Sequence, residues 1–284
     1  MSASGPIIDR RAAIAGTAAA ILAGVAPCAA EEAQTPRVEM QPDLGDLFME
    51  ADTAGTFAML DLAGGRIVVT DRERADTGFL PASTFKIPNS LIALETGIAA
   101  DADSTMFPWD NVVRDFDAWN QDHTLRTAFK ASAVPVYQDI ARKIGPERMQ
   151  QYVDGFNYGN RDIGGAPIDM FWLNGALRIS AFQQIDFLAK LYRGELPASE
   201  ENQQIVRDIM YLEQSEFGTL RGKTGAVGIG VAPGSKATLG WLVGWLEHSA
   251  KAYIFAMNID VREPKQLALR MPLTKTLLKR AIPL

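Results

Sequence analysis

The first pattern that could do chemistry is a serine followed three residues later by a lysine, Ser83–Thr84–Phe85–Lys86, at the predicted start of a helix. Residues three apart share one face of a helix, so Lys86 is expected to reach the Ser83 hydroxyl. The helix N-terminus also directs backbone N–H groups and the positive end of the dipole toward a developing oxyanion. Because the chain has only two histidines, a lysine is the natural activator of a serine nucleophile here.

A second pattern, Lys223–Thr224–Gly225, falls where a strand is expected. The Lys and Thr side chains could hold a substrate carboxylate through charge-assisted hydrogen bonds, and a glycine lets the backbone approach a ligand closely. Each pattern alone is weak. Average composition produces roughly one Ser-x-x-Lys by chance in a chain of this size, and it also fits a helix-capping serine beside a solvated lysine.

Together, the two patterns are the signature of penicillin-recognising serine enzymes. The chain resembles the class D β-lactamases in particular, because five motifs occur in the order typical of that family: Ser83-Thr-Phe-Lys86, Ser132-Ala-Val134, Tyr158-Gly-Asn160, Phe171-Trp172-Leu173 and Lys223-Thr-Gly225. The stretch that ends at Arg270 also resembles the family's C-terminal carboxylate-binding segment.

The resemblance implies a reaction at these positions. Ser83 would attack the lactam carbonyl, and Lys86 would carry a carbamate made from carbon dioxide (N6-carboxylysine) and act as the general base. Ser132 would pass a proton to the departing lactam nitrogen. The backbone N–H groups of Ser83 and Ala226 would form the oxyanion hole.

The resemblance also implies two further groups of residues. The substrate-binding group is Lys223, Thr224, Gly225, Ala226 and Arg270. The supporting group is Val134, Trp172, Tyr158 and Asn160.

Elementary chemistry is compatible with a carbamate on Lys86. A free lysine titrates near pH 10.4 and does not attack carbon dioxide while protonated, but burial can lower its pKa by several units. Val134 and Trp172 would supply the apolar wall that the resemblance implies, and the indole N–H of Trp172 is a donor for a carbamate oxygen. Carbon dioxide or bicarbonate is then the one small reactant required, with no organic cofactor.

The elements around these motifs predict an α/β (α+β) chain. Residues 56–62 and 66–70 read as a hairpin, and residues 238–246 and 252–259 as further strands. Helical patterns cover 83–97 and 265–281, and Ser180 with Gln183 forms a capping box for another helix.

Strands at both ends of the chain with helices between them indicate one sheet built from both ends. The fold class expected is therefore the β-lactamase/penicillin-recognising fold, a central, mainly antiparallel sheet flanked by helices plus an inserted helical region. The sheet region would cover about 38–75 and 216–284, and the helical region about 76–215.

Residues 1–30 read as an export signal ahead of a β-lactamase domain at 31–284. Arg10 and Arg11 precede a soft apolar stretch at 12–26, and small residues close it at 28–30. The arginine pair leaves both the general and the twin-arginine export routes open. A periplasmic or secreted protein without a stable membrane anchor is expected.

Composition narrows the function classes further. A net charge of −6 argues against nucleic acid as a partner. Cys28 is the only cysteine, and His123 and His248 do not form a metal-binding spacing, so no metal site is expected. Residues 218–224 resemble a Walker A loop but are one residue short. The expected partners are β-lactam antibiotics, and the oligomeric state and substrate spectrum stay open.

Two rival interpretations remain. A penicillin-binding protein or β-lactam sensor domain shares both patterns but keeps the drug covalently bound, and such relatives usually carry Asn at the position of Val134. A periplasmic binding module with a dead site would take up no penicillin on Ser83.

Overall fold

A computed structural model describes residues 1–2, 36–229, 234, 236 and 238–282. Residues 3–30 of the expected export signal lie outside this set, as do 230–233, 235 and 237 in the connection after Lys-Thr-Gly. The segment Thr35–Leu284 forms one compact unit.

A seven-stranded sheet forms the centre of this unit, in the order β1-β3-β2-β7-β6-β5-β4. Only β1 and β3 run parallel, and all other neighbours are antiparallel. The strands are β1 (Arg37–Met40), β2 (Gly55–Asp61), β3 (Arg66–Val69), β4 (Tyr211–Ser215), β5 (Gly218–Val227), β6 (Leu239–His248) and β7 (Lys251–Asp260). Because β2 pairs with β7, the two ends of the sequence meet in the middle of the sheet, as expected.

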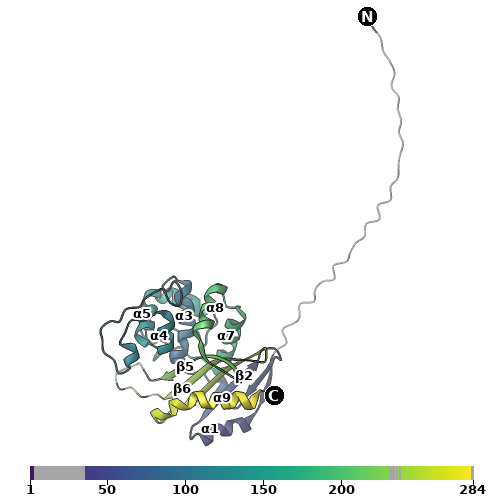
Figure 1. Ribbon diagram of the computed structural model, residues 1–284, viewed down its shortest axis with the longest axis vertical. Coiled ribbons are helices and arrows are strands. Elements are labelled where there is room, and N and C mark those ends of the chain that lie inside the picture. Colours follow the sequence, from purple (N-terminus) through teal and green to yellow (C-terminus); the bar gives the residue numbers. More distant parts are fainter. Residues whose placement is uncertain (3–35, 230–233, 235, 237, 283–284) are drawn as a thin grey trace. The chain divides into compact units, whose positions relative to one another are not determined.

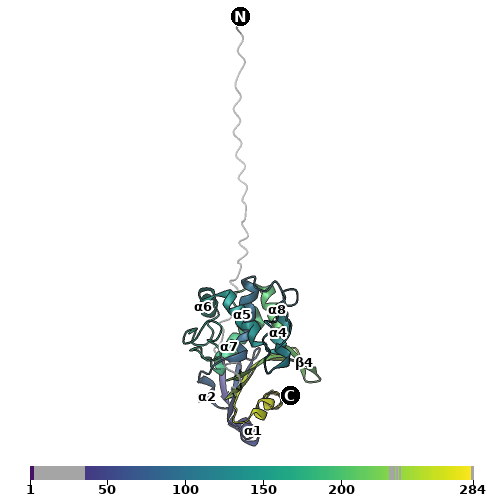
Figure 2. The ribbon, with the colours of Figure 1, turned by 90° about the vertical axis from the view of Figure 1, so that its left-hand side faces the viewer.

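Helices cover both faces of the sheet, which Figures 1 and 2 show from two directions. The α-helices are α1 (Asp46–Glu50), α2 (Arg72–Asp76), α3 (Lys86–Glu95), α4 (Leu125–Ala131), α5 (Val134–Ile144), α6 (Pro146–Gly155), α7 (Ala181–Arg193), α8 (Glu200–Ile209) and α9 (Arg270–Ala281). Short 3-10 turns are η1 (Pro42–Gly45), η2 (Ala82–Phe85), η3 (Asp117–Trp119) and η4 (Pro264–Leu269). Helix α7 packs on β2 and β7 from the side of the helical region, and α9 contacts the same strands together with β6.

The alternation of side chains along the strands divides the core in two. In β7, Ile254 and Ala256 join the cluster under the helical region, whereas Phe255, Met257 and Ile259 join the cluster under α9. Successive residues of a strand point to opposite faces, so the nearly continuous apolar run of β7 indicates a strand covered on both sides.

Most of the expected elements form at the expected places. The predicted hairpin is confirmed, because β2 pairs antiparallel with β3. The capping box is also confirmed, because Ser180 Oγ accepts from the Gln183 N–H and the Gln183 side chain accepts from the Ser180 N–H.

Three boundaries differ from the sequence patterns. Ser83 lies in the 3-10 turn η2, and the α-helix begins only at Lys86. This places Pro88 in the first turn of α3, where an N–H has no partner within the helix and a proline is tolerated. Helix α9 likewise begins at Arg270, after η4. Strand β4 lies at residues 211–215, which we expected to belong to the helical region. It is a short edge strand whose burial does not alternate along the chain, so hydrophobic periodicity does not reveal it.

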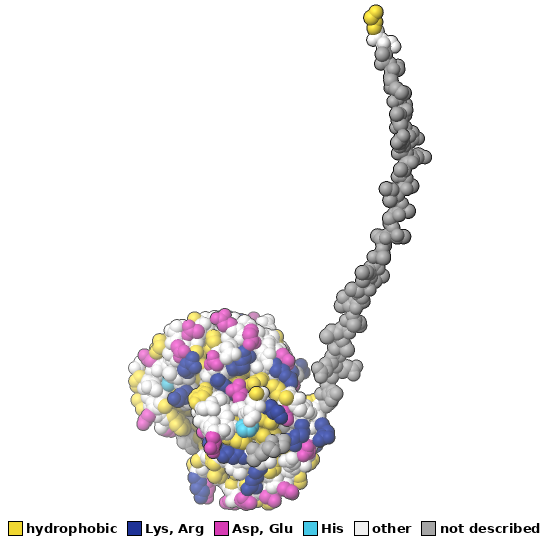
Figure 3. All heavy atoms as spheres, turned by 45° about the vertical axis from the view of Figure 1, so that its right-hand side comes forward, with side chains coloured by type: hydrophobic (Ala, Val, Ile, Leu, Met, Phe, Trp, Pro, Cys, Tyr) yellow, Lys and Arg dark blue, Asp and Glu magenta, His cyan; other side chains and the backbone are white. Residues whose placement is uncertain are grey.

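The surface is mixed in charge. Figure 3 shows acidic and basic side chains interspersed over the face that it presents. In the described part of the chain, no helix combines the length and apolarity that crossing a membrane requires.

Candidate active site

The site begins at the turn that leads into α3. Lys86 Nζ lies 3.0 Å from Ser83 Oγ, so the expected contact between these two side chains is present. Ser83 is partly exposed and Lys86 is fully buried. An ammonium donates to the hydroxyl at this distance, whereas a neutral amine accepts the hydroxyl proton.

The surroundings of Lys86 disfavour its charge. Burial lowers the pKa of Lys86 well below its usual value, and the nearby cation of Lys223 lowers it further. Within the described residues no carboxylate pairs with this lysine. A lowered pKa increases the fraction of the neutral amine, and the neutral amine is the form of lysine that can act as a base or a nucleophile.

Lys223 lies on β5, and its side chain links this strand to Ser132 at the end of α4. Its Nζ donates to Ser132 Oγ (3.1 Å) and to the Thr224 carbonyl (2.9 Å). Burial, followed by the positive charge of Arg270, lowers the pKa of Lys223 to about 7. Ser132 is therefore hydrogen-bonded to a group that can exchange a proton near neutral pH.

Gly225 explains how β5 approaches the nucleophile so closely. A Cβ placed on Gly225 would lie 3.1 Å from the Pro81 carbonyl oxygen and 3.1 Å from Thr84 Cγ2. Strand β5 also packs against η2. The glycine of Lys-Thr-Gly thus permits packing of the strand against the serine turn.

Arg270 supports the same strand from α9. Its Nη1 donates to the Gly225 carbonyl (2.6 Å), and its Nε donates to the Leu267 carbonyl (2.7 Å). Gly240, the partner of Ala226 in the β5–β6 ladder, leaves space for this side chain, because a Cβ there would lie 3.0 Å from Arg270 Cδ. Burial lowers the pKa of Arg270 to about 10, so it remains a cation at neutral pH.

Two residues of the site have left-handed backbone conformations. Ala82, which precedes the nucleophile, has φ 47°, and Ser132 has φ 53° at the end of α4. Such values are unfavourable for residues other than glycine and persist only where the surroundings hold them. At Ala82 the N–H donates to the Trp172 carbonyl (3.0 Å), which ties the serine turn to the Phe-Trp-Leu motif.

Aromatic and aliphatic side chains enclose the site from below. Trp172 is fully buried and stacks on Phe85 with ring centroids 5.5 Å apart. Its indole Nε1 has no hydrogen-bond partner among the residues that the structure describes, which is unusual for a buried donor. Val134 is buried at the first position of α5.

The Tyr158-Gly-Asn160 motif forms a turn that is locked to the segment before α7. Asn160 Nδ2 donates to the Ala176 carbonyl (2.9 Å), and its Oδ1 accepts from the Arg178 N–H (2.9 Å). Gly159 has φ 59°, and a Cβ there would lie 2.2 Å from the Arg178 carbonyl oxygen. These contacts join the motif to the segment before α7, and its role as a support of the site stays a prediction.

One side chain close to the site was not singled out in the sequence. The ring centroid of Tyr137, on α5, lies 5.1 Å from Lys86 Nζ. The available signal was its spacing, because Tyr137 follows Val134 by three residues and so shares its helix face. An isolated aromatic at helical spacing is otherwise typical of core packing.

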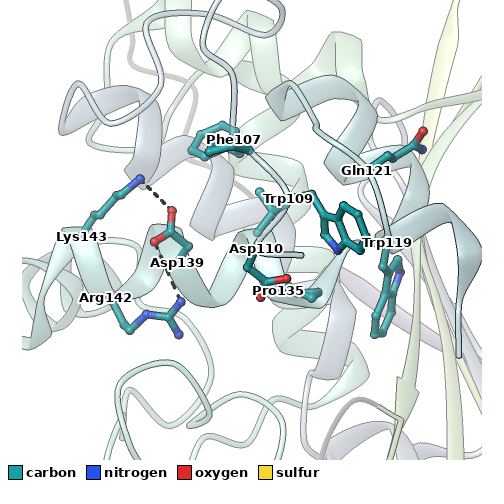
Figure 4. Close-up of a pocket in the computed structure, with 11 residues that line it drawn as sticks. Phe107, Trp109, Asp110, Trp119, Gln121, Pro135, Asp139, Arg142 and Lys143 are labelled. Carbon is teal, nitrogen blue, oxygen red and sulfur yellow. Dashed lines mark ion pairs between the residues drawn. The ribbon is translucent and has the colours of Figure 1, made fainter. Parts of the chain in front are cut away.

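A further cavity of about 300 Å³ lies beside α5 and is shown in Figure 4. Among its charged side chains, Asp139 pairs with both Lys143 (2.7 Å) and Arg142 (3.9 Å), and Arg142 also pairs with Asp169 outside the cavity (2.6 Å). The indole of Trp119, which also lines it, donates to the Ala131 carbonyl (3.1 Å). This wall therefore holds the residue that precedes Ser132.

Among the described residues, no cluster of three or more His, Cys, Asp or Glu side chains is arranged to hold a metal ion.

Comparison with known proteins finds a family model and several named β-lactamases that are similar to this chain. Residues 51–279 match the family described as penicillin binding protein transpeptidase domain. The chain is 47% identical over 208 residues to β-lactamase OXA-48 of Klebsiella pneumoniae, covering 73% of this chain and 76% of that protein. It is 44% identical to β-lactamase OXA-10 of Pseudomonas aeruginosa, covering 76% and 80% respectively.

Solved structures agree. The class D β-lactamase YbXI from Nostoc superposes with a TM-score of 0.78 at 42% identity, over 84% of this chain and 98% of that one. FUS-1 (OXA-85), a class D β-lactamase from Fusobacterium nucleatum subsp. polymorphum, gives a TM-score of 0.79 at 38% identity, over 86% and 98%.

Proposed function

The chain belongs to the class D β-lactamases, and from this premise we propose that it hydrolyses β-lactam antibiotics through an acyl-enzyme on Ser83, with a carbamate on Lys86 as general base. The single observation that carries the proposal is the contact of the partly exposed Ser83 with the buried Lys86, whose Nζ lies 3.0 Å from Ser83 Oγ and has no carboxylate partner among the described residues.

The surroundings of Lys86 fit a carbamate. Carbon dioxide reacts with the neutral amine to form an N–C bond and release one proton, so a lysine with a lowered pKa favours the reaction. The buried Trp172 N–H, which has no partner in the described part of the chain, is a donor that a carbamate oxygen would satisfy. When present, the carbamate supplies a base for the serine proton and later for the attacking water.

The chain's own residues would carry the acylation step. Ser83 Oγ bonds to the lactam carbonyl carbon, and the backbone N–H groups of Ser83 and Ala226 would stabilise the oxyanion. The C–N bond then breaks, and Ser132 would pass a proton to the departing nitrogen. The hydrogen bond from Lys223 Nζ to Ser132 Oγ supports this role, because it provides a source of that proton.

The substrate carboxylate would bind beside β5. Lys223 and Arg270 supply the two cations, and Thr224 adds a hydroxyl at the partly exposed edge. The Arg270 guanidinium already holds the Gly225 carbonyl, so it would meet a carboxylate without a large rearrangement. We further propose that residues 1–30 direct export to the periplasm or the medium.

The test is hydrolysis of a chromogenic cephalosporin by protein that begins at residue 31, with and without added bicarbonate. Repeated turnover that increases with bicarbonate is the expected result. A single stoichiometric burst would instead favour a penicillin-binding or sensor activity, which the match to the transpeptidase family makes the second candidate. No uptake of labelled penicillin on Ser83 would refute both.

A further inference from the structure

The aromatic ring of Tyr137 lies over the terminal nitrogen of the catalytic lysine. Lys86 Nζ is 3.0 Å from Ser83 Oγ and 5.1 Å from the centroid of the Tyr137 ring. Both Lys86 and Tyr137 are fully buried. The terminal nitrogen therefore has both a hydroxyl group and an aromatic face as neighbours.

The ring itself is held in place. The Tyr137 hydroxyl lies 2.8 Å from Ser90 Oγ, and Ser90 is also fully buried. Ser90 follows Lys86 by four residues, so both lie on the face of α3 that meets α5. Burial raises the pKa of the Tyr137 hydroxyl, so the ring stays neutral at every pH at which the enzyme would work.

Few groups facing Lys86 favour its protonated form. Lys223 on β5 opposes it through charge repulsion, and burial opposes it through lost hydration. Within the described residues no carboxylate from a neighbouring element faces this nitrogen. An aromatic face attracts an ammonium, and more strongly where water is excluded. The ring of Tyr137 therefore partly balances two effects that expel the proton.

We propose that Tyr137 is a positioning residue, fixed by Ser90, that keeps Lys86 Nζ on the Ser83 hydroxyl and sets the balance between the ammonium and neutral forms of Lys86. This inference rests on the proposed function. The inference gives the aromatic face of Tyr137 a role beyond filling space. By setting the fraction of neutral Lys86, the ring would set how much of the lysine can react with carbon dioxide.

The sharpest test compares two rings of nearly equal shape. Tyr137→Phe keeps the aromatic face, and incorporation of 3,4,5-trifluorophenylalanine at position 137 withdraws charge from it. We expect Tyr137→Phe to retain kcat/KM within about threefold, since only the hydrogen bond to Ser90 is lost. The trifluoro variant should shift the acidic limb of the kcat/KM profile to lower pH by about 0.5–1 unit, because the ammonium loses stabilisation.

A spectroscopic measurement reads the same equilibrium directly. With 13C-labelled bicarbonate, the carbamate carbon gives an NMR signal whose pH dependence should shift in the same direction in the trifluoro variant. Identical acidic limbs and identical NMR titrations for the two ring variants would overturn the inference.

Removing the ring tests the positioning role. Tyr137→Leu should lower kcat at least tenfold with little change in KM, because the base and not the substrate is displaced. Tyr152→Leu, on α6 and half-buried against Phe156, is the matched control and should keep kcat unchanged. Wild-type kcat in Tyr137→Leu would also overturn the inference.

The two proposals can fail separately. Turnover by the unsubstituted protein combined with unshifted ring variants refutes only the role of Tyr137. If the unsubstituted protein shows neither turnover nor a carbamate signal, both proposals are wrong.

Discussion

At the scale of single residues, the buried ammonium of Lys223 makes substrate capture depend on pH near neutrality. The pKa of Lys223 is about 7, so its positive charge is lost as the pH rises through that value. We expect KM for an anionic penicillin to increase above pH 7.

Arg270→Gln should raise KM about tenfold or more through the lost charged contact. It should also move the alkaline increase to higher pH, because Arg270 no longer lowers the pKa of Lys223.

The same lysine should destabilise the fold. Its pKa is about 7 in the folded protein and near 10.4 in an unfolded chain, so protons bind more tightly to the unfolded state. The penalty is complete below pH 7 and vanishes as the pH rises toward 10.4. Lys223→Met should therefore abolish turnover yet raise the free energy of unfolding by about 1–3 kcal/mol at pH 7. Urea titrations at pH 7 and pH 10 check this, and a gain that does not shrink at pH 10 would contradict it.

Val134 should separate the two halves of the reaction. A polar side chain at the start of α5 raises the polarity around Lys86, which disfavours the neutral amine and hence the carbamate. We expect Val134→Asn to slow deacylation far more than acylation, measured by burst kinetics. Equal losses in both steps would argue against a special role for the apolar wall.

At the scale of elements, Gly159 couples two loops that support the site. Gly159→Ala would force a Cβ against the Arg178 carbonyl and strain a backbone at φ 59°. We expect the free energy of unfolding to fall by about 2 kcal/mol or more, and thermal denaturation measures this loss. Gly97→Ala is the matched control, because φ is 70° there but nothing lies within 4 Å of the added carbon. It should lose only about 1 kcal/mol. Equal losses would show that the contact with Arg178 is unimportant.

These elements also mark how far the sequence could predict the site. Ser83 and Lys86 were found because i and i+3 side chains meet whenever the chain turns helically, and the 3-10 turn that forms preserves the contact. Lys223 and Ser132 were brought together only through the family resemblance, since no local rule joins residues 91 positions apart. The left-handed backbone at Ala82 left no trace in the sequence, because alanine has no preference for it.

At the scale of the whole molecule, the sheet makes the two ends of the chain and the helical region interdependent. One core cluster contains Ala58 of β2, Ala256 of β7 and Leu91 of α3. We expect a single cooperative unfolding transition in urea, with tryptophan fluorescence and far-UV circular dichroism changing together. Trp172 reports on the helical region and Trp241 on β6, and both are fully buried. Two separated transitions would mean that the helical region unfolds on its own.

The charges of Lys223 and Arg270 affect the rates at which the antibiotic binds and the product leaves. The molecule as a whole carries a net charge of −6, while Lys223 and Arg270 place positive potential at the candidate active site. Such local potential steers an anion inward against the overall repulsion, and dissolved salt screens it. Opening a lactam creates a second carboxylate, so the product is attracted more strongly than the drug that entered. Higher ionic strength should thus slow the association of the substrate and accelerate the dissociation of the product.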